Sequence, residues 1–107
     1  MTERAQKAMA DLESFFQQFR FCGPQVRQSL LPRLGLLRSE ITSVAGADSY
    51  VMQKLGSLEE SCRRLARLRQ PKGFSDSDEI SRGLGDVSVI RDWLIRLGAL
   101  PDPFRKE

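Results

Sequence analysis

Apolar residues recur at helical spacing near the start of the chain. Over residues 2–22 they alternate steps of three and four, at Ala5, Ala8, Leu12, Phe15, Phe19 and Cys22. This heptad pattern places them on one face of a helix. Met9 and Phe16 lie beside that face and widen it, as expected of a helix that packs against two neighbours. The pattern predicts a first bundle helix, which Gly23 and Pro24 end.

A second segment, residues 24–46, has the same periodicity up to a glycine stop at Gly46. Its apolar positions are Val26, Leu30, Leu34, Leu37, Ile41 and Val44. Pro32 interrupts the segment, because proline donates no backbone hydrogen bond and its ring clashes with the preceding turn. We therefore expect a kink, or a short turn followed by a helix from about Leu31. In a continuous helix, Arg27 and Arg38 would lie close to the apolar stripe.

A third long helix is predicted between a cap at residues 47–49 and Pro71. Its apolar positions again alternate steps of four and three: Val51, Leu55, Leu58, Cys62 and Leu65. The connections at Gly23 and at residues 46–47 are very short. Consecutive helices joined in this way are antiparallel neighbours.

The composition changes at Pro71. Residues 71–86 are rich in Pro, Gly, Ser and Asp and lose helical periodicity. We expect an acidic linker here. Ser75 and Asp78 resemble a helix cap, which favours one short helix within the linker, from Asp76 to Arg82 and closed by Gly83.

The last predicted element is a short amphipathic helix over residues 87–97, with Asp86 as its N-cap and Gly98 as its stop. One stripe carries Ile90, Trp93, Leu94 and Leu97. A helix of about eleven residues is not stable alone, so it must pack on its own bundle or on a partner.

Together these elements predict an all-α fold. Residues 1–70 form a three-helix antiparallel bundle with coiled-coil-like heptad packing. Residues 71–86 form the linker, and residues 87–107 form the short fourth helix and the tail. A chain of 107 residues with 40% hydrophobic and 29% charged residues fits one globular domain.

Targeting signals and cysteine usage indicate the compartment. No stretch approaches the roughly 18 apolar residues of a membrane span, and charged residues interrupt the N-terminal apolar positions, unlike a secretory signal. Cys22 and Cys62 each occupy an apolar helical position, which favours free buried thiols over a disulfide. We expect a cytoplasmic or nuclear protein that is not secreted and has no membrane partner.

The residue types exclude most catalytic chemistry. The chain has no His and only two Cys, which removes His-based catalysis and most metal sites. The glycine pair at residues 83 and 85 lacks the other features of a phosphate-binding loop. The acidic residues at 76–79 lack the glycine and the terminal Glu of a calcium loop. We expect no enzyme, no cofactor and no metal site.

The sequence instead favours a non-catalytic protein interaction module, a small adaptor or a subunit of a larger assembly. More apolar residues are present than the helical stripes need, among them Phe21 and Leu68, and such a surplus is typical of an interface. Leu36 points away from its stripe, and Trp93 is a residue type enriched at interfaces. The candidate partner-binding residues are Leu36, Arg63, Arg64, Arg67, Trp93, Leu94, Leu97 and Phe104. The partner is a second copy, in a homodimer, or a larger heteromeric assembly.

The alternative hypothesis is a nucleic-acid-binding domain. Residues 61–75 hold no acid and several basic residues, among them Arg63, Arg64, Arg67 and Arg69, whose guanidinium groups suit phosphate. Aromatic residues for base stacking do not alternate with them. Positive charge at a helix C-terminus is also favourable in itself. The net charge of +3 is too small to drive such binding without local clustering.

Overall fold

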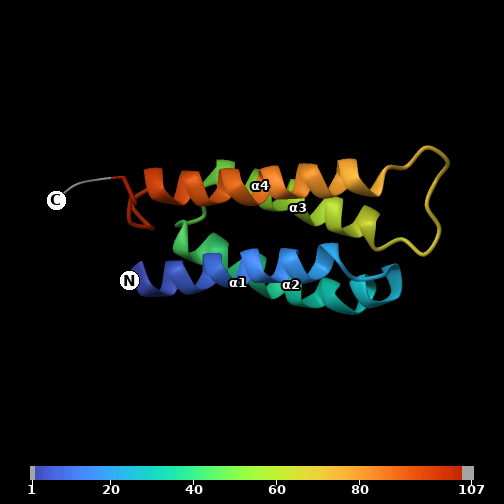
Figure 1. The fold of residues 1–107 in the computed structure, drawn as a ribbon. Coiled ribbons are helices and arrows are strands. Elements are labelled where there is room, and N and C mark those ends of the chain that lie inside the picture. The colour runs from blue at the N-terminus through green and yellow to red at the C-terminus, as the bar shows by residue number, and fades with distance from the viewer. Residues whose placement is uncertain (1, 105–107) are drawn as a thin grey trace.

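A computed structural model describes residues 2–104, which form four α-helices and no strand (Figure 1). The helices are α1 (Thr2–Arg20), α2 (Pro24–Val44), α3 (Ser49–Leu65) and α4 (Asp76–Arg96). Each helix packs against the next, and α4 also packs against α1. The result is an elongated four-helix bundle that measures 51 × 23 × 23 Å. The prediction of an all-α fold is confirmed.

The two ends of this bundle carry different connections. The turn between α1 and α2 and the loop of residues 66–75 lie together at one end, which we call the loop end (Figure 1). The two ends of the chain and the turn between α2 and α3 lie at the opposite end, which we call the terminal end. Successive helices are therefore antiparallel.

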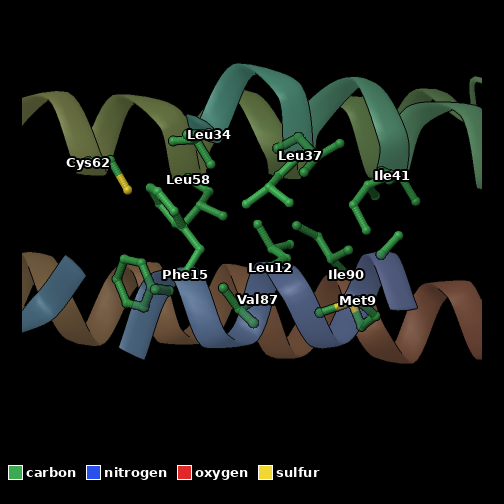
Figure 2. Packing of buried hydrophobic residues seen from close by; sticks show 14 of the residues in the cluster. Met9, Leu12, Phe15, Leu34, Leu37, Ile41, Leu58, Cys62, Val87 and Ile90 are labelled. Carbon is green, nitrogen blue, oxygen red and sulfur yellow. The ribbon is translucent and has the colours of Figure 1, made fainter. Parts of the chain in front are cut away.

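The core consists of apolar side chains from all four helices. Figure 2 shows Met9, Leu12 and Phe15 of α1 facing residues of α2 and α3 across the bundle. The apolar face predicted for α1 is confirmed, because Ala5, Ala8, Leu12, Phe15 and Phe19 are all buried. Cys22 follows the helix and is half-buried. Burial of this apolar surface provides the main driving force for folding.

The second helix runs without interruption from Pro24 across Pro32, so the expected alternative of a short turn followed by a helix from about Leu31 is wrong. Pro32 lies on the exposed side of α2, so its ring projects toward solvent. The buried residues Leu34, Leu37 and Ile41 follow it on the core side. Tertiary packing of this apolar face compensates for the backbone hydrogen bond that proline cannot make.

The fourth helix is much longer than predicted. It begins at Asp76 rather than after Asp86 and spans 21 residues, so residues 76–86 are helical and not linker. The Ser75 side chain caps it by accepting a hydrogen bond from the Asp78 N–H at 3.2 Å. The three acids of the first turn include Glu79, and negative charge there is favoured by the helix dipole.

Gly83 is a packing site in α4 and not a stop. A Cβ added to Gly83 would lie 2.9 Å from Cε1 of Phe16, which is closer than van der Waals contact allows. The missing side chain lets the aromatic ring of α1 approach the backbone of α4. Asp86, the expected N-cap, lies within the helix and is buried.

The other predicted helix boundaries at the terminal end are confirmed. Asp48 caps α3 by accepting hydrogen bonds from the N–H groups of Tyr50 and Val51, each at 3.0 Å. Gly98, with φ of +77°, follows the end of α4. Leu100 beyond it is buried against the bundle.

Candidate partner-binding surface

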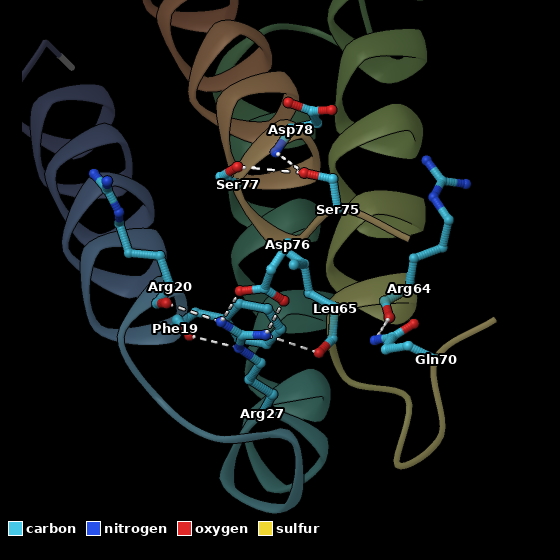
Figure 3. A network of polar contacts seen from close by, with 10 residues as sticks. All are labelled: Phe19, Arg20, Arg27, Arg64, Leu65, Gln70, Ser75, Asp76, Ser77 and Asp78. Atoms are coloured by element: carbon cyan, nitrogen blue, oxygen red, sulfur yellow. Dashed lines mark hydrogen bonds and ion pairs between the residues drawn. The ribbon is translucent and has the colours of Figure 1, made fainter. Parts of the chain in front are cut away.

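One buried arginine organises the loop end. Arg27 of α2 is 4% exposed. Its Nε donates to the carbonyl of Phe19 at 3.1 Å, its Nη2 to that of Arg20 at 2.8 Å and its Nη1 to that of Leu65 at 2.9 Å. The Asp76 carboxylate accepts from Nη1 and Nη2 at 3.1 and 3.3 Å (Figure 3). The guanidinium thus joins α2 to the other three helices.

The chemistry of helix ends explains these bonds. The last carbonyls of a helix have no partner inside the helix and carry partial negative charge. α1 and α3 both end here and α4 begins here, so the guanidinium meets two negative helix ends and a carboxylate. Arginine has five N–H donors and can satisfy all of them. The sequence places Arg27 near the apolar stripe but does not reveal acceptors that come from other helices.

Three large apolar side chains are exposed above this network. Phe21 is 78% exposed, Leu68 61% and Val26 49%. Val26 and Leu68, with residues 23–25, line an open groove of about 320 Å³. Phe21 lies in the turn that precedes the groove. We call Phe21, Pro24, Val26 and Leu68 the loop-end surface.

Positively charged residues adjoin the loop-end surface on the loop that carries Leu68. Arg67 and Arg69 flank Leu68 in sequence, and Lys72 follows on the same loop. All three are exposed, and none forms an ion pair with a residue in the range 2–104. The N-terminus of α2 adds to this charge, because its N-cap Gly23 offers no side-chain acceptor and its first turn holds no acid.

The predicted arginines differ in their surroundings. Arg63 donates to Glu59 at 3.0 Å, on the same helix. Arg64 forms a two-pronged pair with Glu79 of α4, with Nε at 2.7 Å. This hydrogen bond holds the pKa of the buried Glu79 carboxyl below its ordinary value. Arg64 therefore joins α3 to α4, whereas Arg63 pairs only within α3 and, like Arg67, is exposed at the surface.

The predicted apolar partner-binding residues fall into an exposed and a buried group. Leu36 on α2 is 74% exposed and Phe104 in the tail is 92% exposed, so both are accessible to a partner. Leu97 is 44% exposed and lines an open groove of about 720 Å³ at the terminal end. Leu94, in contrast, is fully buried in the core. Leu94 is therefore not accessible to a partner, contrary to the prediction.

Trp93 is half-buried and already has partners within the chain. Its Nε1 donates to the Asp48 carboxylate at 3.0 Å. Its ring lies 4.6 Å from the ring of Tyr50, measured between centroids. Trp93 therefore joins α4 to the start of α3 at the terminal end.

The structure does not gather the predicted residues into one site. Leu36 lies within α2, Arg67 at the loop end, and Leu97 and Phe104 at the terminal end. The loop-end surface is instead formed by the turn after α1, the start of α2 and the loop after α3. Phe21 and Leu68 are recognisable in the sequence as apolar residues outside the stripes, whereas Val26 was expected on a stripe.

Two observations describe the potential metal-binding and nucleophilic groups in residues 2–104. Burial raises the pKa of the Cys62 thiol to about 12, so the thiol stays protonated near neutral pH. No group of three potential metal ligands is present in the described part of the chain. No described helix is both long and apolar enough to cross a bilayer.

Comparisons of this chain with protein-family models, with curated proteins and with solved structures give no match.

Proposed function

We propose that this protein is a non-catalytic interaction module, a small helical adaptor or subunit, that binds a partner protein through the loop-end surface. The observation that supports this most is the exposure of Phe21, Val26 and Leu68 at one end of the bundle, with a groove between two of them. Exposed apolar clusters with a polar rim are typical of protein interfaces.

The base of the surface supports the same function. Arg27 fixes the ends of α1 and α3 and the starts of α2 and α4 relative to one another. The start of α2, which forms most of the groove, is therefore held against the ends of α1 and α3 before a partner binds. A preformed surface loses less conformational entropy on binding than a mobile one.

The ion pairs weigh against the nucleic-acid alternative. Of the four arginines on which that hypothesis depends, Arg64 is paired with the buried Glu79, and Arg63 shares Glu59 with Arg38. Salt-dependent phosphate binding requires cationic groups that are free to replace counterions. A protein partner needs fewer of them, because apolar burial supplies most of the affinity.

Affinity capture with matched variants tests the proposal. The purified chain, the loop-end variant Phe21→Ser/Leu68→Ser and the control variant Leu36→Ser are immobilised, and bound proteins are quantified by mass spectrometry. Leu36 is as exposed as the replaced residues but lies outside the surface. We expect specific partners to be retained by Leu36→Ser and lost from the loop-end variant. Partners that bind all three proteins equally would contradict the proposal.

Light scattering over a dilution series addresses self-association. If the partner is a second copy, the wild-type chain and Leu36→Ser dimerise with the same concentration dependence and the loop-end variant stays monomeric. A dimer that persists in the loop-end variant would place the interface elsewhere.

A further inference from the structure

We infer that the loop-end surface binds an acidic segment of a partner protein that carries one large apolar side chain. This inference rests on the proposed function and specifies the chemistry of the partner. It is carried by the apolar lining of the groove together with the unpaired positive charge around it.

The groove has the size and lining for a single apolar anchor. Its volume of about 320 Å³ lies near the lower limit of ligand pockets, which is roughly 300 Å³. Pro24, Val26 and Leu68 provide apolar surface, and the groove is open along the loop. An anchoring side chain of a docked peptide fits such a site, since the peptide backbone continues outside the groove.

The positive charge beside the groove favours a partner segment with negative charge. The loop of residues 66–75 contains no acid, and Arg67, Arg69 and Lys72 on it are exposed. The acids that follow this loop at the start of α4 include two that are committed elsewhere: Asp76 accepts from Arg27 and Glu79 from Arg64. The uncapped start of α2 adds the positive end of a helix dipole. Carboxylates placed beside an apolar anchor therefore complement this surface.

The same surface suits stacked bases or a bilayer less well. Phe21 is the exposed aromatic ring at the loop end, and the guanidinium of Arg20 lies over one of its faces at 4.8 Å from the ring centroid. Proteins that bind single strands stack successive bases on several aromatic rings, which one exposed ring does not provide. Val26 and Leu68 line a groove instead of forming a protruding tip, and a groove favours a segment that inserts into it.

A display library of random 16-residue peptides tests the inference and requires no identified partner. Peptides are selected on the full chain and counter-selected on the loop-end variant. We expect the enriched peptides to combine several Asp or Glu residues with one Leu, Phe, Met or Trp. The probe for all later measurements is the most enriched peptide, synthesised with a fluorescent label and titrated by anisotropy.

Two variants with the same change in charge separate a local from a general electrostatic effect. Arg67→Glu/Arg69→Glu reverses two charges beside the groove. Arg33→Glu/Arg96→Glu reverses two exposed arginines elsewhere that form no ion pair with described residues. We expect the first variant to weaken peptide binding by at least about tenfold, as for loss of an interface hot spot. The second should change it by less than about threefold, because screening limits long-range effects. Circular dichroism and urea unfolding establish that both variants fold.

The outcomes distinguish failure of the inference from failure of the proposed function. Enriched peptides that need the loop-end surface but carry no excess of acid would overturn the acidic partner and leave the proposed function intact. A library with no enrichment over the counter-selection would overturn both. Phosphatidylserine vesicles and a single-stranded oligonucleotide serve as competing probes. If either binds more tightly than the peptide and loses binding in Arg67→Glu/Arg69→Glu, the acidic protein segment is rejected.

Discussion

The two halves of α4 are held in the bundle by different means. In the half near the loop end, the buried residues are Glu79, Gly83 and Asp86. In the half near the terminal end, they are Val87, Ile90 and Leu94. The first half therefore buries no large apolar side chain completely, although Ile80 and Leu84 pack partly against the core. The second half has a conventional apolar face.

Partners on three other helices replace the missing apolar face of the first half. Arg27 of α2 pairs with Asp76, Arg64 of α3 pairs with Glu79, and a ring of α1 fills the space beside Gly83. Apolar burial is non-directional and tolerates small shifts, whereas hydrogen bonds and close backbone contacts do not. Single substitutions should therefore destabilise the first half more strongly than the second. The ion pairs should also make the stability of the first half depend on pH.

The largest effect is expected for Arg27→Met. This change removes the donor from the helix-end carbonyls of Arg20 and Leu65, and each unsatisfied buried acceptor costs about 1–3 kcal/mol. The Phe19 carbonyl keeps a hydrogen bond from the Cys22 N–H at 3.2 Å, and Asp76 is 54% exposed and reaches water, so both lose less. Water will reach some of them, so we expect a total loss of about 4 kcal/mol in urea unfolding. Hydrogen exchange of the amides in residues 76–86 should accelerate more than that of residues 87–96.

Arg33→Met on the same helix provides the control. Arg33 is exposed and forms no ion pair with a described residue, so the loss should stay within about 0.5 kcal/mol. An equal loss in both variants would show that the buried network contributes little and that the contrast between the two halves is wrong.

The next largest effect is expected for Gly83→Ala. The new methyl group would overlap the ring of Phe16, so either this buried ring or the two helices must shift. Overpacking of this kind costs about 1–3 kcal/mol, which we expect as a lower urea midpoint. Gly85→Ala is the matched control, because nothing lies near its Cβ position. Its gain in helix propensity should stabilise the protein by up to about 1 kcal/mol. A stabilising Gly83→Ala would contradict the close contact.

A smaller and pH-dependent effect is expected for Glu79→Gln. The hydrogen bond from Arg64 lowers the pKa of Glu79 below its ordinary value of 4.5 in the folded state. The pair therefore stabilises the protein at pH values above 4.5, and this contribution is lost as the pH falls through the lowered folded-state pKa. We expect Glu79→Gln to cost about 1–2 kcal/mol at pH 7, since Arg64 is 28% exposed.

The difference between wild type and Glu79→Gln should shrink steadily in urea titrations below pH 4.5. Glu60→Gln, on the exposed side of Arg64, should cost less than about 0.5 kcal/mol at every pH. A difference for Glu79→Gln that does not change with pH would indicate lost packing and not a lost ion pair.

This contrast also explains how much of the fold the sequence predicts. Apolar periodicity identifies α1, α3 and the second half of α4, because in these segments the determinants lie within the helix itself. The first half of α4 has the composition of a linker because its determinants lie elsewhere in the chain. In the sequence, Gly83 looks like the end of a helix. Only the structure shows that the ring of Phe16 occupies the space beside it.

The candidate site shows the same limit. Periodicity separates exposed from stripe positions, so the exposure of Leu36 is predictable. It does not say whether a stripe packs within the chain or on a partner: Leu94 is buried, whereas Leu97 on the same stripe is 44% exposed. Val26 also lies on a stripe, but it stands in the first turn of α2, and the first apolar residue of that helix to be buried is Leu34. A groove between the start of α2 and the loop after α3 depends on tertiary arrangement, which no local pattern contains.

The smallest effect is expected in the second half of α4, for Trp93→Phe. This change removes the hydrogen bond to Asp48 and keeps an aromatic ring beside Tyr50, so we expect a loss of about 1 kcal/mol by urea unfolding. Tyr50→Phe keeps the ring contact and should leave stability within about 0.5 kcal/mol of wild type. If Trp93→Phe also weakens capture of a partner while the loop-end variant does not, the interface lies at the terminal end. If it lowers stability alone, Trp93 joins α3 to α4 and the search for the partner belongs at the loop end.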